Sequence, residues 1–127
     1  MTEIAPEIIG RFFTAMQTGA ASEAQMMALF ADDAVYVEPF TGAPAMHRGK
    51  AAIRQALSAG WRNPLPDMTI TVDDVEVDGQ TVTARWTCRS PGLPGGQGSG
   101  VNVFTLQGGL IGRLETRLGG GNGQVGR

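Results

Sequence analysis

Glu38 is a carboxylate that the chain pattern places beside a tyrosine, and together they form a candidate site of proton transfer. Residues 34–38 alternate as a β-strand does, so Tyr36 and Glu38 share one face while Val35 and Val37 share the other. If the first face lines a cavity, apolar surroundings suit the carboxylate to take or give a proton near neutral pH. The alternative is that Glu38 ends an edge strand in solvent. Which face of this strand points inward therefore decides the role of Glu38.

Asn102 is a second polar side chain in an apolar setting. It shares a strand face with Phe104 and Leu106, so its amide is expected to be buried and to need partners. The amide NH₂ group is neutral at all working pH values and can donate to an oxyanion without titrating. The alternative is that this amide satisfies a backbone group or a bulge.

Histidine and cysteine each occur once, as His47 and Cys88. A disulfide framework, a zinc cluster and a conventional catalytic triad all need more of these residues or a defined partner. His47 lies in a loop beside Arg48, and we expect it to be solvated or bonded to backbone. Cys88 is expected to act as a small buried hydrophobe. The sequence implies no metal site and no organic cofactor.

Length and charge bound the kinds of partner that the chain can have. Its 127 residues suffice for one core, and its formal net charge is −2. That charge gives no field that would attract nucleic acid or an anionic membrane. The N-terminus lacks a basic start followed by an apolar run, and no stretch approaches the length that spans a bilayer. The sequence therefore predicts a cytoplasmic protein without nucleic-acid or membrane partners.

Three helices are expected in the first half of the chain. Residues 6–18 carry apolar side chains at helical spacing. A capping-box pattern, Ser22 followed by Gln25, opens a second helix that runs through Phe30. A third helix is expected over residues 49–60, where a glycine ends it.

Strands fill most of the rest. After the strand at 34–38 and a loop at 39–48, the expected strands are 68–77, 80–90, 101–106 and 110–118. The apolar parity slips at Asp73-Asp74, as it does at a β-bulge. On the last strand, Leu110, Leu114 and Leu118 are expected to face inward.

The predicted strand at 80–90 places Val82, Ala84, Trp86 and Cys88 on its core face. Residues 90–100 are expected to be a flexible connection. The order of elements predicts an α+β domain over residues 1–118, in which a curved antiparallel sheet wraps around the N-terminal helices as a cone-shaped barrel with an apolar pocket. The glycine-rich tail at 119–127 has little apolar content to offset its ordering entropy and is expected to be disordered.

Two sequence segments carry a family resemblance: ALFADDAVYVEPF, which contains Glu38, and HRGKAAIRQAL, which follows it. They resemble the steroid delta-isomerase (ketosteroid isomerase) branch of the nuclear transport factor 2 like superfamily, which also contains SnoaL-type polyketide cyclases. In that isomerase a carboxylate followed by proline shuttles the proton. The resemblance implies this role for Glu38, which stands before Pro39 with Glu in place of the family's Asp.

The match is weaker at the groups that hold the enolate oxygen in the isomerase. The family's catalytic tyrosine corresponds to Phe12, which has no hydroxyl, and its protonated acid corresponds to Asn102. Tyr36, on the same strand face as Glu38, could supply the missing hydroxyl. The resemblance thus implies Glu38, Asn102 and Tyr36 as catalytic residues acting on something other than the family's steroid.

Two other members of this superfamily differ from the chain at the later strands. Limonene epoxide hydrolase uses an Asp-Arg-Asp set; Arg85 fits its arginine, but Thr87 and Thr116 occupy the aspartate positions. SnoaL-type cyclases use an acid on the last strand, where this chain has Thr116, and the nearby Glu115 points outward by parity. The first observation argues against epoxide hydrolysis. The leading hypothesis is a ketosteroid isomerase-like or polyketide cyclase-like enzyme that uses Glu38 for proton transfer.

The resemblance also predicts a pocket for a small hydrophobic carbonyl compound. Its expected lining residues are Phe12, Met16, Phe30, Phe40, Trp61, Trp86 and Phe104. Relatives dimerise through the outward Arg, Thr and Glu face of the sheet, so a homodimer is expected. The rival hypothesis is a non-catalytic domain of the same fold that binds a hydrophobic small molecule or serves dimerisation.

Overall fold

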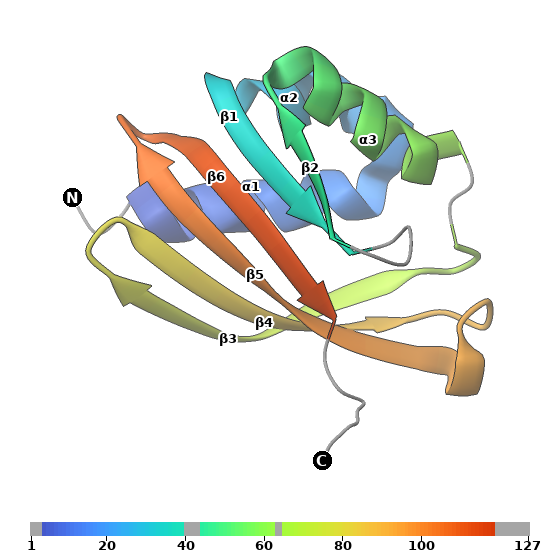
Figure 1. Ribbon diagram of the computed structural model, residues 1–127. Helices are drawn as coiled ribbons and strands as arrows, with labels where there is room; N and C mark the ends of the chain where they lie inside the picture. The colour runs from blue at the N-terminus through green and yellow to red at the C-terminus, as the bar shows by residue number, and fades with distance from the viewer. Residues whose placement is uncertain (1–3, 40–43, 63–64, 119–127) are drawn as a thin grey trace.

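In the described part of the chain, three α-helices lie on one side of a six-stranded sheet (Figure 1). The computed structural model describes residues 4–39, 44–62 and 65–118. The elements are α1 (Ile4–Thr18), η1 (Gly19–Ser22), α2 (Glu23–Ala28), β1 (Phe30–Glu38), β2 (Ala45–Arg48), α3 (Lys50–Arg62), β3 (Thr69–Asp78), β4 (Thr81–Arg89), η2 (Pro94–Gly96), β5 (Gln97–Gln107) and β6 (Leu110–Leu118). Phe40 and the tail at 119–127, for which lining and disorder were predicted, lie outside the described residues.

The strands run in the order β2-β1-β6-β5-β4-β3. Neighbouring strands are antiparallel except for β1 and β6, which are parallel. The predicted α+β class and the curved sheet around N-terminal helices are confirmed. The sheet is mixed rather than wholly antiparallel, because the hairpin from β5 returns β6 alongside β1 in the same direction. It is also an open cone, since β2 and β3 remain as its two edges.

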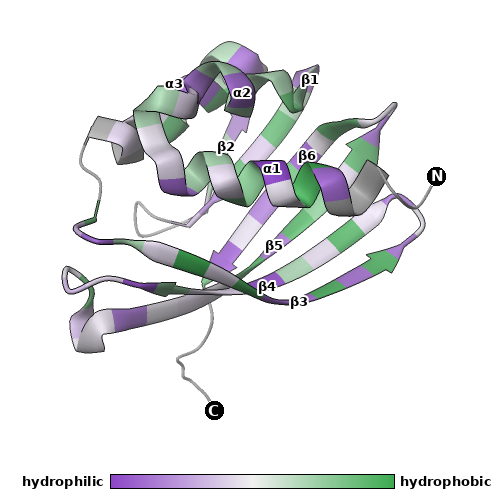
Figure 2. Cartoon of the chain, turned by 180° about the vertical axis from the view of Figure 1, so that it is seen from behind, coloured by the Kyte–Doolittle hydropathy of each residue, from purple (hydrophilic) through white to green (hydrophobic). Residues whose placement is uncertain are grey.

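The apolar stripe of α1 packs on the concave face of the sheet. Ile8, Ile9, Phe12 and Phe13 are buried there, as the helical spacing predicted. The Phe12 ring meets the Phe104 ring edge to face, with centroids 5.1 Å apart. Figure 2 shows α1 crossing this face, and hydrophobic and hydrophilic residues alternate along the strands beneath it. This alternation places one side of each strand in the core.

The second helix is shorter than predicted. It covers Glu23–Ala28, and its N-cap Ser22 makes no side-chain capping bond. Phe30 instead begins β1 and pairs with Ile111, whose backbone N–H donates to the Leu29 carbonyl over 2.7 Å. Contact with β6 therefore ends the helix earlier than local propensity indicates. No helix in the described part of the chain is long and apolar enough to cross a membrane.

Two segments predicted as loops are partly strands. Residues 45–48 form β2 and pair with residues 35–38 of β1. Residues 97–100 extend β5 and pair with residues 86–89 of β4. Both are short or glycine-rich, so their pairing depends on the neighbouring strand more than on their own sequence.

The strands β3 and β6 both contain irregularities that change which side chains face inward. The predicted bulge at Asp73-Asp74 is confirmed, because the β3 to β4 register shifts between Val72 and Asp74. A second bulge, which was not predicted, lies at Gly112: Leu106 pairs with Ile111, while Thr105 pairs with Arg113. The inward prediction for Leu110 is therefore wrong, and Leu110 is 38% exposed while Ile111 is buried.

Candidate functional site

A cavity of about 710 Å³ lies between α1, α3 and the concave face of the sheet. Most of its wall is apolar or aromatic, and four of the predicted lining residues contribute: Phe12, Met16, Trp61 and Trp86. Its polar groups include Tyr36, Glu38, Asn102 and Thr116. All three residues predicted to be catalytic thus reach one cavity, although they come from β1 and β5.

Two predicted lining residues lie elsewhere. Phe30 and Phe104 are fully buried in the core and do not line the cavity. Phe104 supports the cavity wall from the core, because its ring packs against Phe12, and Phe12 lines the cavity. Leu118, predicted to face inward, lies at the cavity wall yet remains 54% exposed.

Glu38 is buried, and one of its partners is the single histidine. Its Oε2 lies 3.0 Å from Nε2 of His47. The side chain of Glu38 is 8% exposed and that of His47 is 27% exposed. Burial on the cavity side of β1 contradicts the alternative in which Glu38 ends an edge strand in solvent.

The contact with His47 arises from strand pairing. In the β1 to β2 ladder Tyr36 lies opposite His47, so both side chains point to the same face of the sheet as Glu38. The prediction that His47 is solvated or bonded to backbone did not include its contact with the Glu38 side chain; the His47 side chain is 27% exposed. If residues 45–48 were known to form a strand after Pro39 and Pro44, its pairing with residues 35–38 would have predicted the contact between residues 38 and 47. The sequence does not identify residues 45–48 as a strand, so the contact could not be predicted.

The Asn102 amide is held in one orientation by two donors. Its Oδ1 accepts from Nε1 of Trp86 over 3.1 Å and from Oγ1 of Thr116 over 2.9 Å. An indole N–H can only donate, so the atom that it contacts must be the amide oxygen. Among the described residues, no acceptor is hydrogen-bonded to the Asn102 NH₂ group, although Asn102 is only 4% exposed. The amide therefore offers its N–H bonds at the cavity wall.

Tyr36 extends this chain of hydrogen bonds. Its hydroxyl is bonded to the Thr116 side chain. The Thr116 hydroxyl also donates to Asn102 Oδ1, so Thr116 links the two side chains. Burial raises the pKa of Tyr36 well above its usual value; the hydrogen bond with Thr116 lowers it by less, and the nearby Glu38 carboxylate raises it further. Tyr36 therefore stays protonated and supports Asn102 through Thr116.

Trp86 can reach Asn102 because the residue opposite it is a glycine. Gly100 pairs with Trp86 across β4 and β5, and a Cβ at position 100 would overlap the indole ring and lie 2.8 Å from the Arg117 carbonyl. The indole thus lies over the backbone of Gly100. Gly100 therefore sets the position of one of the two donors to Asn102.

Replacing Gly100 with alanine is expected to lower the free energy of unfolding by about 1–3 kcal/mol, because a core without space must shift to admit a methyl group. Denaturant unfolding measures this change. Fluorescence in a Trp61→Phe background, where Trp86 is the remaining tryptophan, should report a moved indole. Gly98→Ala is the matched control, since its Cβ would meet only Leu93 Cδ1 at 3.9 Å. Equal stability and equal Trp86 emission in both variants would contradict the close contact.

Sequence reasoning missed some of the residues that shape the site and placed others correctly. Thr116 was considered only as a substitute for an acid, yet it bonds both Asn102 and Tyr36. Cys88 is buried as predicted and also lines the cavity, and burial raises the pKa of its thiol. Arg85 and Thr87 face outward, where they bond Asp74 over 2.8 Å and Asp73 over 2.6 Å.

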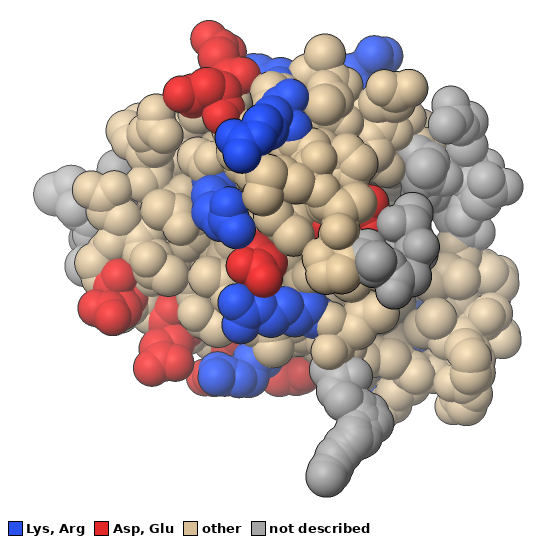
Figure 3. Space-filling view, viewed as in Figure 1, with Lys and Arg blue, Asp and Glu red and all other residues tan. Residues whose placement is uncertain are grey.

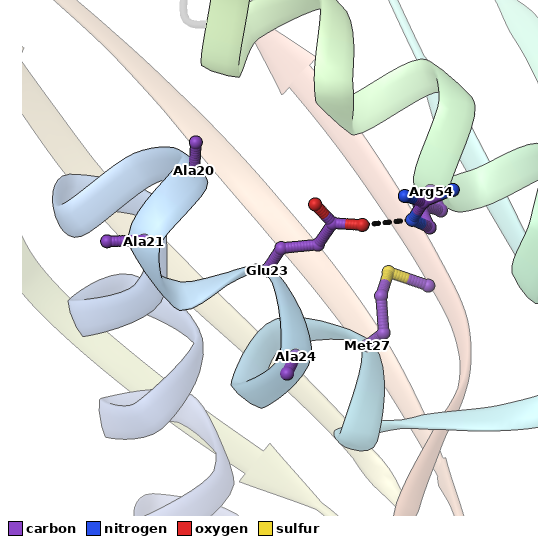
Figure 4. Close-up of a pocket in the computed structure, with 6 residues that line it drawn as sticks. All are labelled: Ala20, Ala21, Glu23, Ala24, Met27 and Arg54. Atoms are coloured by element: carbon purple, nitrogen blue, oxygen red, sulfur yellow. Dashed lines mark hydrogen bonds and ion pairs between the residues drawn. The ribbon is translucent and has the colours of Figure 1, made fainter.

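A second depression lies outside the sheet, between η1, α2 and α3 (Figure 4). It is lined by Ala20, Ala21, Glu23, Ala24, Met27 and Arg54. The Glu23 carboxylate is paired with the Arg54 guanidinium across it, so both charged groups already have a partner. Ala20 and Ala21 also line the large cavity, which makes η1 a thin wall between the two. The candidate site is therefore the large cavity.

The sequence of this chain matches a known family. Residues 9–114 match the SnoaL-like domain family. The chain belongs to the SnoaL-like domain family. This match spans the sequence from α1 to Leu114 on β6 and includes Glu38, His47 and Asn102.

Solved structures similar to this SnoaL-like domain support the same assignment. A candidate polyketide cyclase from Sinorhizobium meliloti is 25% identical, with a TM-score of 0.72 over 88% of this chain and 94% of that chain. A nuclear transport factor 2 like protein of unknown function from Mesorhizobium loti is 25% identical, with a TM-score of 0.73 over 91% of each chain.

A more distant structure shares the fold of this SnoaL-like domain. A candidate ketosteroid isomerase from Kribbella flavida is 18% identical, with a TM-score of 0.71 over 91% of this chain and 78% of that chain. No curated protein matches the chain in sequence. The comparisons therefore show the family and the nuclear transport factor 2 like fold, and a single activity does not follow from them.

Proposed function

We propose that this SnoaL-like domain is a ketosteroid isomerase-like or polyketide cyclase-like enzyme that transfers a proton on a small hydrophobic carbonyl compound. The observation that carries the proposal is the meeting of Glu38 and the outward-directed Asn102 NH₂ group in one apolar cavity. A base and a neutral donor are the two groups that enolate formation requires. The named structural relatives, a candidate cyclase and a candidate isomerase, support the same class of chemistry.

In the proposed reaction, Glu38 removes a proton from the carbon beside the substrate carbonyl. The electron pair of that C–H bond forms the enolate double bond, and the carbonyl π electrons move to oxygen. The Asn102 N–H groups stabilise this negative oxygen, and the protonated Glu38 then returns a proton to carbon. Glu38 is a carboxylate again at the end of the cycle, and no co-reactant is consumed.

The hydrogen bonds around Asn102 strengthen its donor ability. Because Oδ1 accepts from both Trp86 and Thr116, the amide is polarised toward a more positive NH₂ group. The donor is also fixed before the charge develops, so little reorganisation accompanies the reaction. Direct donation by Tyr36, which the family resemblance suggested, stays a prediction; in the proposed mechanism Tyr36 supports Asn102 through Thr116.

The cavity wall limits what the substrate can be. Phe12, Trp61 and Met68 are among the groups that present apolar surface. A planar ring compound with one carbonyl oxygen would bury its apolar part there while its oxygen meets Asn102. Phe12 offers no hydroxyl at the position of the isomerase tyrosine, so the proposed substrate is one whose enolate needs a single amide donor.

Cyclohex-3-enone is a suitable probe, because its conversion to cyclohex-2-enone needs one proton removed and one returned. The proposal expects the protein to accelerate this conversion, followed by ultraviolet absorbance of the conjugated product. The alternative function, a non-catalytic domain that binds a hydrophobic small molecule, expects a rise in melting temperature with cyclic ketones and no conversion. Binding without conversion across cyclic enones would overturn the enzymatic proposal.

We also propose that the outward face of the sheet forms a homodimer. Figure 3 shows charged side chains of both signs interspersed over this face. On β6 the Glu115 carboxylate lies 3.0 Å from Arg117 and 3.6 Å from Arg113. A face that carries both signs can complement its own copy around a twofold axis. Sedimentation at the mass of one chain would contradict this proposal.

A further inference from the structure

Glu38 lies between the cavity and His47. Glu38 lines the cavity, whereas His47 is absent from its wall and belongs to β2, the edge strand of the sheet. The histidine side chain is 27% exposed, compared with 8% for the carboxylate. One Glu38 oxygen is 3.0 Å from His47 Nε2. The carboxylate that faces the ligand is thus joined on its other side to a ring that reaches solvent.

We infer that His47 carries protons between Glu38 and water, so that the site exchanges the substrate proton with solvent rather than keeping it. This inference rests on the proposed role of Glu38 in proton transfer. Because His47 acts through Glu38 and does not line the cavity, it is a positioning residue that also serves as a proton relay. The ligand can stay in a closed apolar cavity while its proton is replaced.

The relay balances one proton in and one proton out. Water gives a proton to Nδ1 of His47, and the resulting imidazolium passes its Nε2 proton to Oε2 of Glu38. The carboxylic acid can then protonate the enolate carbon. In reverse, a proton on Oε2 passes to Nε2, and the Nδ1 proton leaves to water. Histidine suits this task because its two nitrogens can each bind a proton.

Among the described residues, Glu38 alone is hydrogen-bonded to the His47 ring. The Tyr36 ring is close, with its centroid 6.0 Å from that of His47, but its hydroxyl is hydrogen-bonded to the Thr116 side chain. No described residue is hydrogen-bonded to Nδ1, and the His47 side chain, which is 27% exposed, belongs to the edge strand β2. The ring therefore has one nitrogen for the carboxylate and one for solvent.

The fate of the proton distinguishes the relay from a carboxylate that works alone. An isolated carboxylate returns the abstracted proton to the same substrate, whereas a relayed one returns a proton from the solvent. We therefore expect cyclohex-2-enone formed from cyclohex-3-enone in D₂O to carry deuterium at the reprotonated carbon. Mass spectrometry and NMR of early product, corrected for exchange in buffer alone, measure the deuterium content.

His47→Gln is the deciding variant, because glutamine can still hydrogen-bond Glu38 but cannot relay a proton. The relay predicts that this variant still forms product, with a several-fold lower deuterium content. In His47→Ala, added imidazole should restore the deuterium content, an effect that a purely structural role of His47 would not produce. Product from His47→Gln with the same deuterium content as wild type would overturn the relay. If the wild-type protein did not convert cyclohex-3-enone at all, that result would overturn the proposed function and not the relay alone.

A measurement without turnover tests the relay in that case too. His47 is the only histidine of the chain, so labelling with ¹⁵N-histidine gives the signals of one ring. The contact predicts that Glu38→Gln shifts the Nε2 resonance, while the Nδ1 resonance continues to show exchange with water. Ring signals that are indifferent to Glu38→Gln, or an Nδ1 that is shielded from water, would overturn the relay whatever the substrate proves to be.

Discussion

Glu38→Gln is expected to lower conversion of cyclohex-3-enone by about 10²–10⁴-fold while leaving ketone binding nearly unchanged. Glutamine has almost the shape of glutamate and can still contact His47 Nε2, so the fold and the cavity should persist. It cannot accept a proton from carbon, so the base is lost. Initial rates measure the first effect, and the ketone-induced rise in melting temperature measures the second.

Glu7→Gln is the matched control for this experiment. Glu7 lies on α1 outside the cavity, with its side chain 58% exposed and paired with Arg11. Its substitution removes one carboxylate without touching the site, and conversion should stay at the wild-type rate. Equal rates in Glu38→Gln and Glu7→Gln would remove Glu38 from the mechanism, and the conversion would then need another base.

Asn102→Ala is expected to reduce conversion by about 10²–10³-fold, the usual effect of losing one donor to a developing oxyanion. The variant also leaves Trp86 Nε1 and Thr116 Oγ1 without their acceptor, so a loss of about 1–3 kcal/mol in unfolding free energy is expected for each buried group. Rates must therefore be measured well below the melting temperature of the variant.

Thr116→Val separates the two effects. It removes the same Thr116 to Asn102 hydrogen bond but keeps the amide NH₂ group and the bond from Trp86. Its loss of stability should resemble part of that in Asn102→Ala, while its loss of rate should be much smaller. If both variants lost rate in proportion to stability, Asn102 would be a structural residue, and the enolate would need another donor.

Periodicity was sufficient to predict the elements that enclose the cavity. The stripe of Ile8, Ile9, Phe12 and Phe13 identifies the buried face of α1 without any tertiary information. The alternation through Val82, Ala84 and Cys88 does the same for β4. These residues contact a large continuous core, so their burial depends on the overall pattern and little on exact register.

The polar contacts could not be predicted in the same way, because they depend on register. The Glu38 to His47 contact needs β2, a four-residue strand whose sequence shows no strand pattern. The Asn102 to Thr116 contact joins residues directly opposite each other on β5 and β6. That pairing can be predicted only when the bulge at Gly112 is known, and a glycine alone is not sufficient to predict a bulge.

The bulge at Gly112 also determines which chemical group meets Asn102. The hairpin pairs Leu106 with Ile111, and a regular ladder continued from there would bring Glu115 opposite Asn102. Glu115 would then point into the core, and Thr116 would point to the surface. The extra residue reverses this order and keeps Glu115 with its arginines. A shift of one residue in register would therefore place the Glu115 carboxylate, rather than the Thr116 hydroxyl, opposite Asn102. Evolution could thus alter the chemistry of the cavity by a change at Gly112, which does not line it.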